Sequence, residues 1–148
     1  MKSEPTTYSI DDLERDGCTC WEGVRNYQAR NLMREMSTGD RVLFYHSNAK
    51  PPCVVGEARV TREAYPDYFA QDPDSRYFDE KATPDDPRWF MVDVAFVRKL
   101  PSPVALDALK SATGLENMVV TKRSRLSVQP VTPAEFDIVC TLGAAERT

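Results

Sequence analysis

The chain has 148 residues, of which 41% are hydrophobic and 28% are charged, and its formal net charge is -4 at pH 7. This length predicts one domain over residues 1–148 with a buried core and excludes a multidomain enzyme, and the composition is typical of a soluble globular protein. The net charge disfavours a protein that binds nucleic acid through general attraction to phosphates.

The negative charge is concentrated in one segment. Residues 63–93 contain nine acidic and three basic side chains, a net charge of -6, whereas the other 117 residues carry +2. A local basic surface is therefore compatible with the overall charge. No apolar run approaches the roughly 20 residues that cross a bilayer, and the first residues lack the apolar stretch of a secretory signal, so we expect a cytoplasmic protein without a membrane segment.

Two short helices are predicted near the N-terminus. Ser9, followed three residues later by an acidic side chain, forms a capping pattern for a helix that ends near Gly17. Asn26 is placed to cap a second helix over 27–36, in which apolar side chains recur at near-helical spacing.

Strands are predicted in the middle of the chain. Residues 41–46 and 53–60 are rich in β-branched and aromatic side chains and are joined by a short turn, so they should pair as antiparallel neighbours. Residues 64–88 contain four prolines and several aspartates, which predict a long, ordered, acidic loop. The segment 89–100 then alternates between apolar and polar side chains like a strand.

The C-terminal third predicts a helix over 102–112, a short strand over 125–129 and a final helix over 132–143. Ser102 is placed to cap the first of these helices, and Thr132 begins a capping box for the second. Strands dominate the middle of the chain and helices flank them, without an alternating strand–helix rhythm. We therefore expect an α+β fold, a small mixed or antiparallel barrel with peripheral helices.

Metal and cofactor chemistry finds little support in the sequence. Zinc sites usually combine four nitrogen or sulfur ligands at close paired spacings, and the scattered glycines form no phosphate-binding loop, so we expect reduced structural thiols, no metal and no cofactor. For the single histidine, His46, we favour a half-buried strand residue that is hydrogen-bonded to the backbone over a catalytic residue, because no orienting acid is identifiable. The chain has four cysteines without a C-x-x-C pair, and one histidine: Cys18, Cys20, Cys53, Cys140 and His46.

The densest chemical pattern lies in residues 21–31. Trp21 offers a stacking face, Gly23 permits close approach of the backbone, and Asn26 offers an amide donor and a carbonyl acceptor, an inventory that suits a planar heterocycle. The structural alternative is a loop in which Trp21 fills the core and Asn26 caps the next helix. Both interpretations stay open on these residues alone.

A basic run and a group of aromatic residues are further candidates. Residues 121–125 carry a charge of +3 beside hydroxyl groups that suit phosphate oxygens, with Ser127 or Gln129 placed to read a base edge, although most short charge runs are solvated surface. The aromatic residues of the acidic loop either cover a pocket or pin the loop to the barrel, and we favour the second role for most of them: Tyr65, Tyr68, Phe69, Tyr77 and Phe78.

In their order and spacing, four stretches of the chain closely resemble the EVE domain family, and the likeness covers essentially the whole sequence. Members usually begin a few residues earlier with an aromatic-rich strand, so we expect a shortened first strand or a natural start upstream of Met1. The four stretches are Lys2-Ser3-Glu4-Pro5, residues 21–31, Phe44-Tyr45-His46-Ser47-Asn48 and Arg125-Leu126-Ser127-Val128-Gln129-Pro130-Val131.

The resemblance implies a PUA-like fold, a mixed β pseudo-barrel with flanking α-helices, related to the YTH and ASCH domains. It also implies a non-enzymatic reader of modified bases, chiefly modified cytosines in DNA, in which a flipped base is held by stacking and by hydrogen bonds to its edges. We accordingly expect a nucleic acid partner, DNA in preference to RNA, and a monomer.

Carried over to this chain, the resemblance and the residue chemistry give a set of expected site residues. The base pocket is expected to comprise Ser3, Glu4, Trp21, Gly23, Val24, Asn26, Tyr45, His46, Ser47, Asn48, Leu126 and Ser127. Flanking phosphates are expected to contact Lys2, Arg25, Lys122, Arg123 and Arg125.

Two other functions compete with the reader. One is a small hydrolase of modified nucleosides, like some ASCH relatives, in which Lys2, Glu4 and Ser127 would supply the base and the nucleophile or activated water. The other is a protein-interaction module that uses the acidic loop. The kind of base modification stays open in the sequence.

Overall fold

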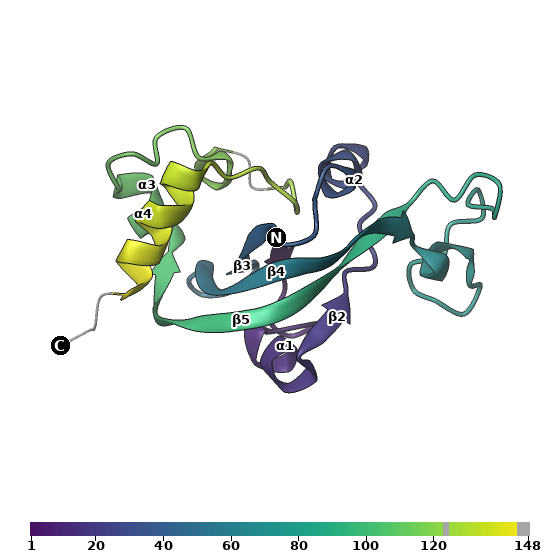
Figure 1. Ribbon diagram of the computed structural model, residues 1–148, viewed down its shortest axis with the longest axis horizontal. Helices are drawn as coiled ribbons and strands as arrows, with labels where there is room; N and C mark the ends of the chain where they lie inside the picture. Colours follow the sequence, from purple (N-terminus) through teal and green to yellow (C-terminus); the bar gives the residue numbers. More distant parts are fainter. Residues whose placement is uncertain (123–124, 145–148) are drawn as a thin grey trace.

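The computed structural model describes residues 1–122 and 125–144 and contains one mixed five-stranded sheet in the order β1-β3-β4-β5-β2 (Figure 1). The strands are β1 (Lys2–Ser3), β2 (Cys18–Cys20), β3 (Arg41–His46), β4 (Cys53–Pro66) and β5 (Phe90–Ala105). β1 runs parallel to β3, and the other neighbouring pairs are antiparallel, which confirms the predicted pairing of β3 with β4. Register shifts along β4 and β5 mark irregular points, and such irregularities bend strands.

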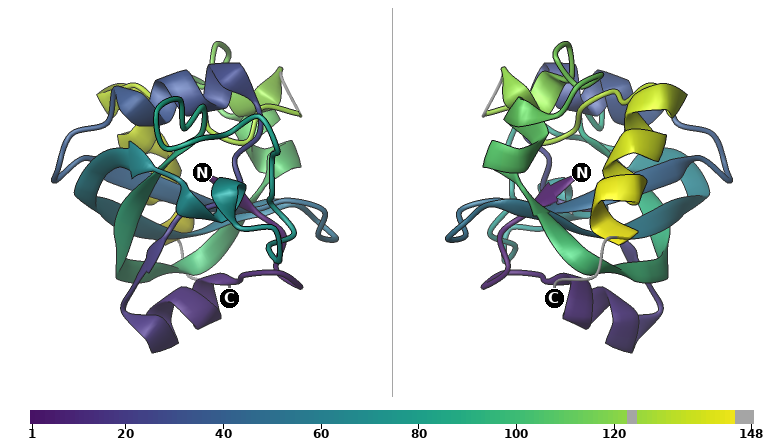
Figure 2. Two further views of the ribbon diagram at one scale, coloured as in Figure 1. Left: turned by 90° about the vertical axis from the view of Figure 1, so that its right-hand side faces the viewer. Right: turned by 90° about the vertical axis from the view of Figure 1, so that its left-hand side faces the viewer.

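The helices lie around this sheet, with α3 and α4 at one end and the loop between β4 and β5 at the other (Figure 1). In both end views of Figure 2, α2 lies above the sheet and α1 below it. The helices are α1 (Ile10–Asp16), α2 (Tyr27–Arg34), α3 (Leu106–Ser111) and α4 (Pro133–Ala144), with short 3-10 helices η1 (Tyr68–Gln71) and η2 (Val119–Thr121). Within the described ranges, no helix is long and apolar enough to span a membrane.

Local capping chemistry sets where the helices begin. The Ser9 hydroxyl accepts a hydrogen bond from the Asp12 N–H, and the Asp12 carboxylate accepts one from the Ser9 N–H, a reciprocal box that starts α1. Thr132 and Glu135 form the same arrangement at the start of α4. Gly17 ends α1 with a φ of 78°, a conformation that glycine adopts without steric cost. These predicted boundaries are confirmed.

Strand β3 separates two hydrophobic cores. Successive side chains of a strand point to opposite faces, so Phe44 belongs to a core that also holds Leu13, and Leu43 belongs to a core that holds Phe136. The first core packs residues of α1 and α2 against the sheet, and the second packs residues of α3 and α4. Because β3 is buried on both faces, the residues beside it have little freedom to move.

The predicted helix over 102–112 is wrong at its start. Strand β5 continues to Ala105, and helix α3 begins only at Leu106. Ser102 and Val104 are buried, while the prolines on either side of Ser102 are exposed, which is the two-residue period of a strand. Proline has no N–H group to donate, and it is tolerated here because the strand pairing is irregular. The two-residue period, and not the capping pattern at Ser102, therefore determines the secondary structure of residues 102–105.

The predicted strand over 125–129 is also absent. Leu126 and Val128 are buried in the first core, so the burial alternates as in a strand. The backbone contact with β1 is a hydrogen bond of 2.9 Å from the Lys2 N–H to the Ser127 carbonyl, too little to form a ladder.

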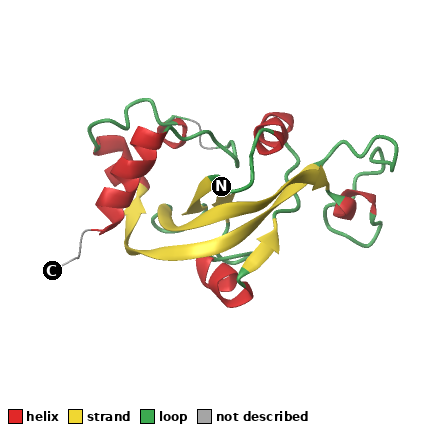
Figure 3. Ribbon diagram, in the orientation of Figure 1, coloured by secondary structure: helices red, strands yellow, loops and turns green. Residues whose placement is uncertain are grey.

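The acidic loop is shorter than predicted. β4 extends to Pro66, and the remaining loop, residues 67–89, contains only η1 (Figure 3). β2, which has three residues, pairs with β5. β2 was not predicted from the sequence, because three residues are too few to show an alternation of apolar and polar side chains. The two-residue β1 agrees with the expected shortened first strand.

Candidate functional site

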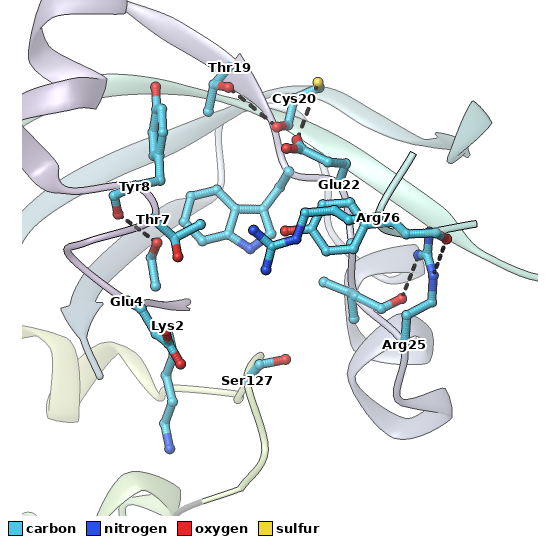
Figure 4. A pocket seen from close by; sticks show the side chains of 15 residues that line it. Lys2, Glu4, Thr7, Tyr8, Thr19, Cys20, Glu22, Arg25, Arg76 and Ser127 are labelled. Atoms are coloured by element: carbon cyan, nitrogen blue, oxygen red, sulfur yellow. Dashed lines mark hydrogen bonds between the residues drawn. The ribbon is translucent and has the colours of Figure 1, made fainter. Parts of the chain in front are cut away.

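A cavity of about 370 Å³ lies between β1, the end of β2 and the loop 67–89 (Figure 4). This volume falls in the range of about 300–1,000 Å³ that small-molecule sites occupy. The lining comes from five separate stretches of chain, and eight of the expected site residues are among them. The lining residues are Lys2, Ser3, Glu4, Thr7, Tyr8, Thr19, Cys20, Trp21, Glu22, Gly23, Val24, Arg25, Arg76, Tyr77 and Ser127.

Trp21 supplies a fixed aromatic wall. Its side chain is 9% exposed, and its ring packs edge-on against Phe44 with centroids 5.5 Å apart and an interplanar angle of 86°. Its backbone N–H donates to the Val92 carbonyl at 2.8 Å, which ties the residue to β5 just beyond β2. The residue therefore fills the core and lines the cavity at once, so the two interpretations of the sequence apply together.

Tyr77 approaches the same segment from the loop 67–89. Gly23 has a φ of +85°, and a Cβ atom built there would lie 2.5 Å from the Tyr77 ring. Only glycine therefore permits both this backbone conformation and this approach. Tyr77 lines the cavity and also pins the loop, so it serves both of the roles that the sequence left open for the aromatic residues of this loop.

A buried carboxylate fastens the loop to the cavity. Asp67 is completely buried and accepts hydrogen bonds from the Gly23 N–H at 2.9 Å and from Arg25 Nη1 at 3.0 Å. Arg25 also donates from Nε and Nη2 to the Tyr77 carbonyl, at 3.2 and 2.7 Å. The Arg25 guanidinium is thus occupied within the protein, and this geometry does not support its expected contact with phosphate.

Cys20 and Glu22 form a polar edge beside Trp21 (Figure 4). The Cys20 thiol lies 3.5 Å from Glu22 Oε2 and donates to it. Burial and the Glu22 carboxylate raise the pKa of the Cys20 thiol to about 11, so it stays protonated near neutral pH. Neither residue was predicted as part of the site, although each is a direct neighbour of Trp21 in the sequence.

Lys2, Glu4 and Ser127 lie on the side of the cavity opposite Cys20 (Figure 4). Burial lowers the pKa of the Lys2 ammonium group, whose nitrogen lies 5.6 Å from the centroid of the Tyr45 ring. The Ser3 hydroxyl donates to the Tyr8 carbonyl at 2.6 Å and so orders the chain that leads from β1 toward α1. This side of the cavity is built on the shortest strand of the sheet.

Comparison with known proteins identifies the family. The EVE domain family matches residues 1–142. This chain belongs to the EVE domain family. The PUA-like α+β fold expected from the resemblance is confirmed by its likeness to the solved domain of human thymocyte nuclear protein 1, at 44% identity and a TM-score of 0.92 over 99% of this chain and 98% of that one.

Other relatives of this EVE domain cover its length almost completely. Full-length human thymocyte nuclear protein 1 is 44% identical over 99% of this chain and 73% of that protein. A solved hypothetical protein from Leishmania major is 50% identical, with a TM-score of 0.93 over 97% of this chain and 91% of that one. The human THYN1 protein in complex with 5-methylcytosine-containing DNA is 43% identical, with a TM-score of 0.93 over 99% of this chain and 97% of that one.

Six expected pocket residues of this EVE domain lie outside the cavity lining. Asn26 Oδ1 accepts the Ala29 N–H at 3.0 Å and caps α2, while His46 Nε2 accepts the Ile10 N–H at 3.1 Å at the start of α1. The structure therefore shows the half-buried, backbone-bonded histidine that the sequence favoured. The six residues are Asn26, Tyr45, His46, Ser47, Asn48 and Leu126.

The described residues of the expected basic run of the EVE domain, Thr121, Lys122 and Arg125, also lie outside the lining. Lys122 and Arg125 are exposed, and Lys122 Nζ lies 3.3 Å from Asn117 Oδ1, to which it donates. Arg123 lies outside the described residues. Across residues 1–122 and 125–144, no group of three or more His, Cys, Asp or Glu side chains is arranged to hold a metal ion. All four cysteines are free thiols.

Proposed function

We propose that this protein binds DNA that contains a modified cytosine and takes the flipped base into the cavity beside Trp21. The observation that carries the proposal is the DNA complex of a relative with 43% identity and a TM-score of 0.93, which contains 5-methylcytosine. Likeness at this level over nearly the full length of both chains supports the same class of ligand. Enzymes and readers that engage one base of a duplex remove it from the stack in this way.

The chemistry of the cavity suits a pyrimidine. The Trp21 ring provides a stacking surface, and stacking of one base on an aromatic ring contributes about 1–3 kcal/mol. Glu22 carries a carboxylate at the edge of the cavity, and carboxylates accept from the exocyclic amino group of cytosine. Thymine carries the same 5-methyl group but has a carbonyl oxygen in place of that amino group. The carboxylate therefore favours methylated cytosine over thymine.

The proposal is tested by titrating the protein into labelled duplexes that differ at one central base. Duplexes with 5-methylcytosine, 5-hydroxymethylcytosine, cytosine and thymine are compared at one salt concentration, because salt alone changes the affinity of a protein for DNA. We expect at least one modified cytosine to bind more tightly than both cytosine and thymine. Equal affinity for all four duplexes would contradict the proposal.

One observation also favours the hydrolase as a second candidate. Lys2, Glu4 and Ser127, the residues that the sequence assigned to it, line one cavity. The candidate predicts release of product when modified nucleosides are incubated with the protein and separated by chromatography. Complete inertness over a panel of acylated and alkylated nucleosides would remove it. The cytoplasmic location and the monomeric state stay predictions.

A further inference from the structure

A second surface begins at the wall of the cavity. Arg76 and Tyr77 line both the cavity and a neighbouring hollow of about 480 Å³ that reaches Trp89. Trp89 in turn stacks on Tyr27, the first residue of α2, with ring centroids 4.8 Å apart and an interplanar angle of 24°. The neighbouring hollow is also lined by Asp79 and Glu80, and Trp89, which is 5% exposed, connects it to the start of α2 through its contact with Tyr27.

Two arginines on this surface place their guanidinium groups over aromatic rings. The guanidinium carbon of Arg30 is 4.7 Å from the centroid of the Tyr27 ring, and that of Arg76 is 5.0 Å from the centroid of the Tyr77 ring. Among residues 1–122 and 125–144, neither guanidinium has a carboxylate within ion-pair distance. Arg30 donates from Nε and Nη2 to Asn31 Oδ1, at 3.1 and 2.9 Å, and from Nη1 to the Arg88 carbonyl, at 2.8 Å. A guanidinium has five N–H donors, so two remain at Arg30, and Arg76 is exposed; these groups suit phosphate oxygens.

A third arginine supports this arrangement. Arg88 has a φ of 62°, a conformation that costs free energy in a residue with a side chain, and its carbonyl accepts from Arg30 Nη1 at 2.8 Å. Its guanidinium donates to the Tyr27 hydroxyl and lies 3.8 Å from the Asp79 carboxylate. Arg88 therefore has a carboxylate partner in Asp79 and positions its neighbours through Tyr27 and its own carbonyl.

We propose that the arginine surface, formed by Tyr27, Arg30, Arg76 and Arg88, binds the phosphates of the DNA strand next to the flipped base. The inference rests on the proposed function, because it needs a DNA strand that leads into the cavity. It supplies the cations that Arg25, bonded to Asp67, cannot. A nucleic acid strand fits better than an acidic peptide, because Arg76 lines both this hollow and the base-sized cavity next to it.

The inference is tested with Arg30→Gln and Arg76→Gln. Lys110→Gln is the control, since it removes one positive charge from α3, at the end of the molecule opposite the loop 67–89 (Figure 1). Affinities for the methylated and the unmethylated duplex are measured over a series of salt concentrations. We expect each arginine variant to bind both duplexes several-fold more weakly and to reduce the salt slope by about 1. The preference for the methylated base should stay unchanged in Arg30→Gln, because Arg30 does not line the cavity.

The outcomes separate this inference from the function on which it rests. Slopes that stay at the wild-type value in both arginine variants, or that fall equally in Lys110→Gln, would overturn the arginine surface even if the methylated duplex is preferred. Slopes that fall only in the arginine variants would support it, including when the wild-type protein shows no preference for a modified base. Because Arg30→Gln also removes a hydrogen bond to Arg88, Arg76→Gln and the melting temperatures guard against a folding effect.

Discussion

Trp21 both packs in the first core and lines the cavity, which determines how its proposed role in base binding must be tested. An alanine would leave a cavity in the first core, so Trp21→Leu is the better variant because it keeps apolar volume and removes the ring. We expect the affinity for the methylated duplex to fall by roughly 5- to 150-fold, the equivalent of about 1–3 kcal/mol of lost stacking. Fluorescence polarisation with the labelled duplex measures the change.

Phe44→Leu is the control for this variant, because Phe44 packs against the Trp21 ring without lining the cavity. It should lower the melting temperature and leave the affinity of the folded protein nearly unchanged. If both variants lose binding to the same extent, the effect belongs to the core and not to the stacking face.

His46 makes the stability of the protein dependent on pH. Burial lowers the pKa of its imidazole, and Nε2 accepts the Ile10 N–H, so the folded state favours the neutral form. The unfolded chain binds a proton more readily, with a pKa near 6.5, and the free energy of unfolding must therefore decrease as the pH falls below about 6.5.

The variant His46→Gln isolates this contribution, since the glutamine side chain also carries an acceptor and does not titrate. Urea unfolding at about pH 7.5 and about pH 5.5 brackets the unfolded-state pKa. We expect the wild-type protein to lose more unfolding free energy than the variant between these conditions. An equal loss in both proteins would show that other groups cause the acid sensitivity.

At the scale of elements, the loop 67–89 is held to the cavity by one buried carboxylate. One Asp67 oxygen accepts from Gly23 and Arg25 and the other accepts the Phe69 N–H at 3.0 Å, so the single amide oxygen of Asp67→Asn cannot replace both. We expect a loss of about 1–3 kcal/mol in unfolding free energy, the usual cost of leaving buried donors without an acceptor. Trypsin should also cleave the folded variant faster after Arg76.

Asp74→Asn removes the same charge from an exposed position of the same loop and serves as the control. It should match the wild-type protein in urea unfolding and in the rate of tryptic cleavage. Equal destabilisation by the two substitutions would mean that the charge of the loop, and not the contacts of Asp67, holds it in place.

Helix boundaries could be predicted from the sequence because their causes are local. The capping residues at the starts of α1 and α4 act over three positions, and the structure has both boxes where the sequence predicts them. Strands β3 and β4 were predicted for a similar reason, since their composition and the short turn between them are contiguous in the chain. The resemblance then supplied the overall arrangement.

The failures concern contacts between distant residues. Arg25 looked like a phosphate ligand, but its partner Asp67 lies 42 positions away, and no local pattern connects them. The segment 125–129 has the alternation of a strand, yet the hydrogen bonds that define a strand depend on a partner that the sequence does not specify. The lining residues Arg76 and Tyr77 come from a loop that only tertiary structure brings to Trp21.

For the whole molecule, part of the acidic charge is used to fold the loop 67–89. Asp67 is buried in hydrogen bonds, the Asp72 carboxylate accepts the Asp74 N–H, and the Asp79 carboxylate accepts from the Trp89 indole at 2.7 Å. The Trp89 hydrogen bond holds the pKa of Asp79 below its ordinary value, so this carboxylate stays charged near neutral pH. In the proposed complex, the phosphates of the DNA contact the few cations of the arginine surface.

This distribution predicts a weak dependence of DNA binding on salt. We expect the slope of log affinity against log salt to be about -2 to -4, the equivalent of roughly two to four phosphate contacts at about 0.9 each. Titrations of the wild-type protein at four or more salt concentrations give the slope. A value steeper than about -6 would indicate a broad electrostatic interface that the arginine surface does not explain.

The cavity takes its lining from five separate stretches of chain, so its shape exists only when the whole fold is intact. A molecule that occupies it binds the folded protein and not the unfolded chain, and its binding free energy adds to stability. A ligand at about 100 times its Kd contributes about 2.7 kcal/mol in this way. The melting temperature of the unlabelled protein thus reports occupancy, and a panel of modified nucleosides and oligonucleotides can be ranked by the thermal shift that each one produces.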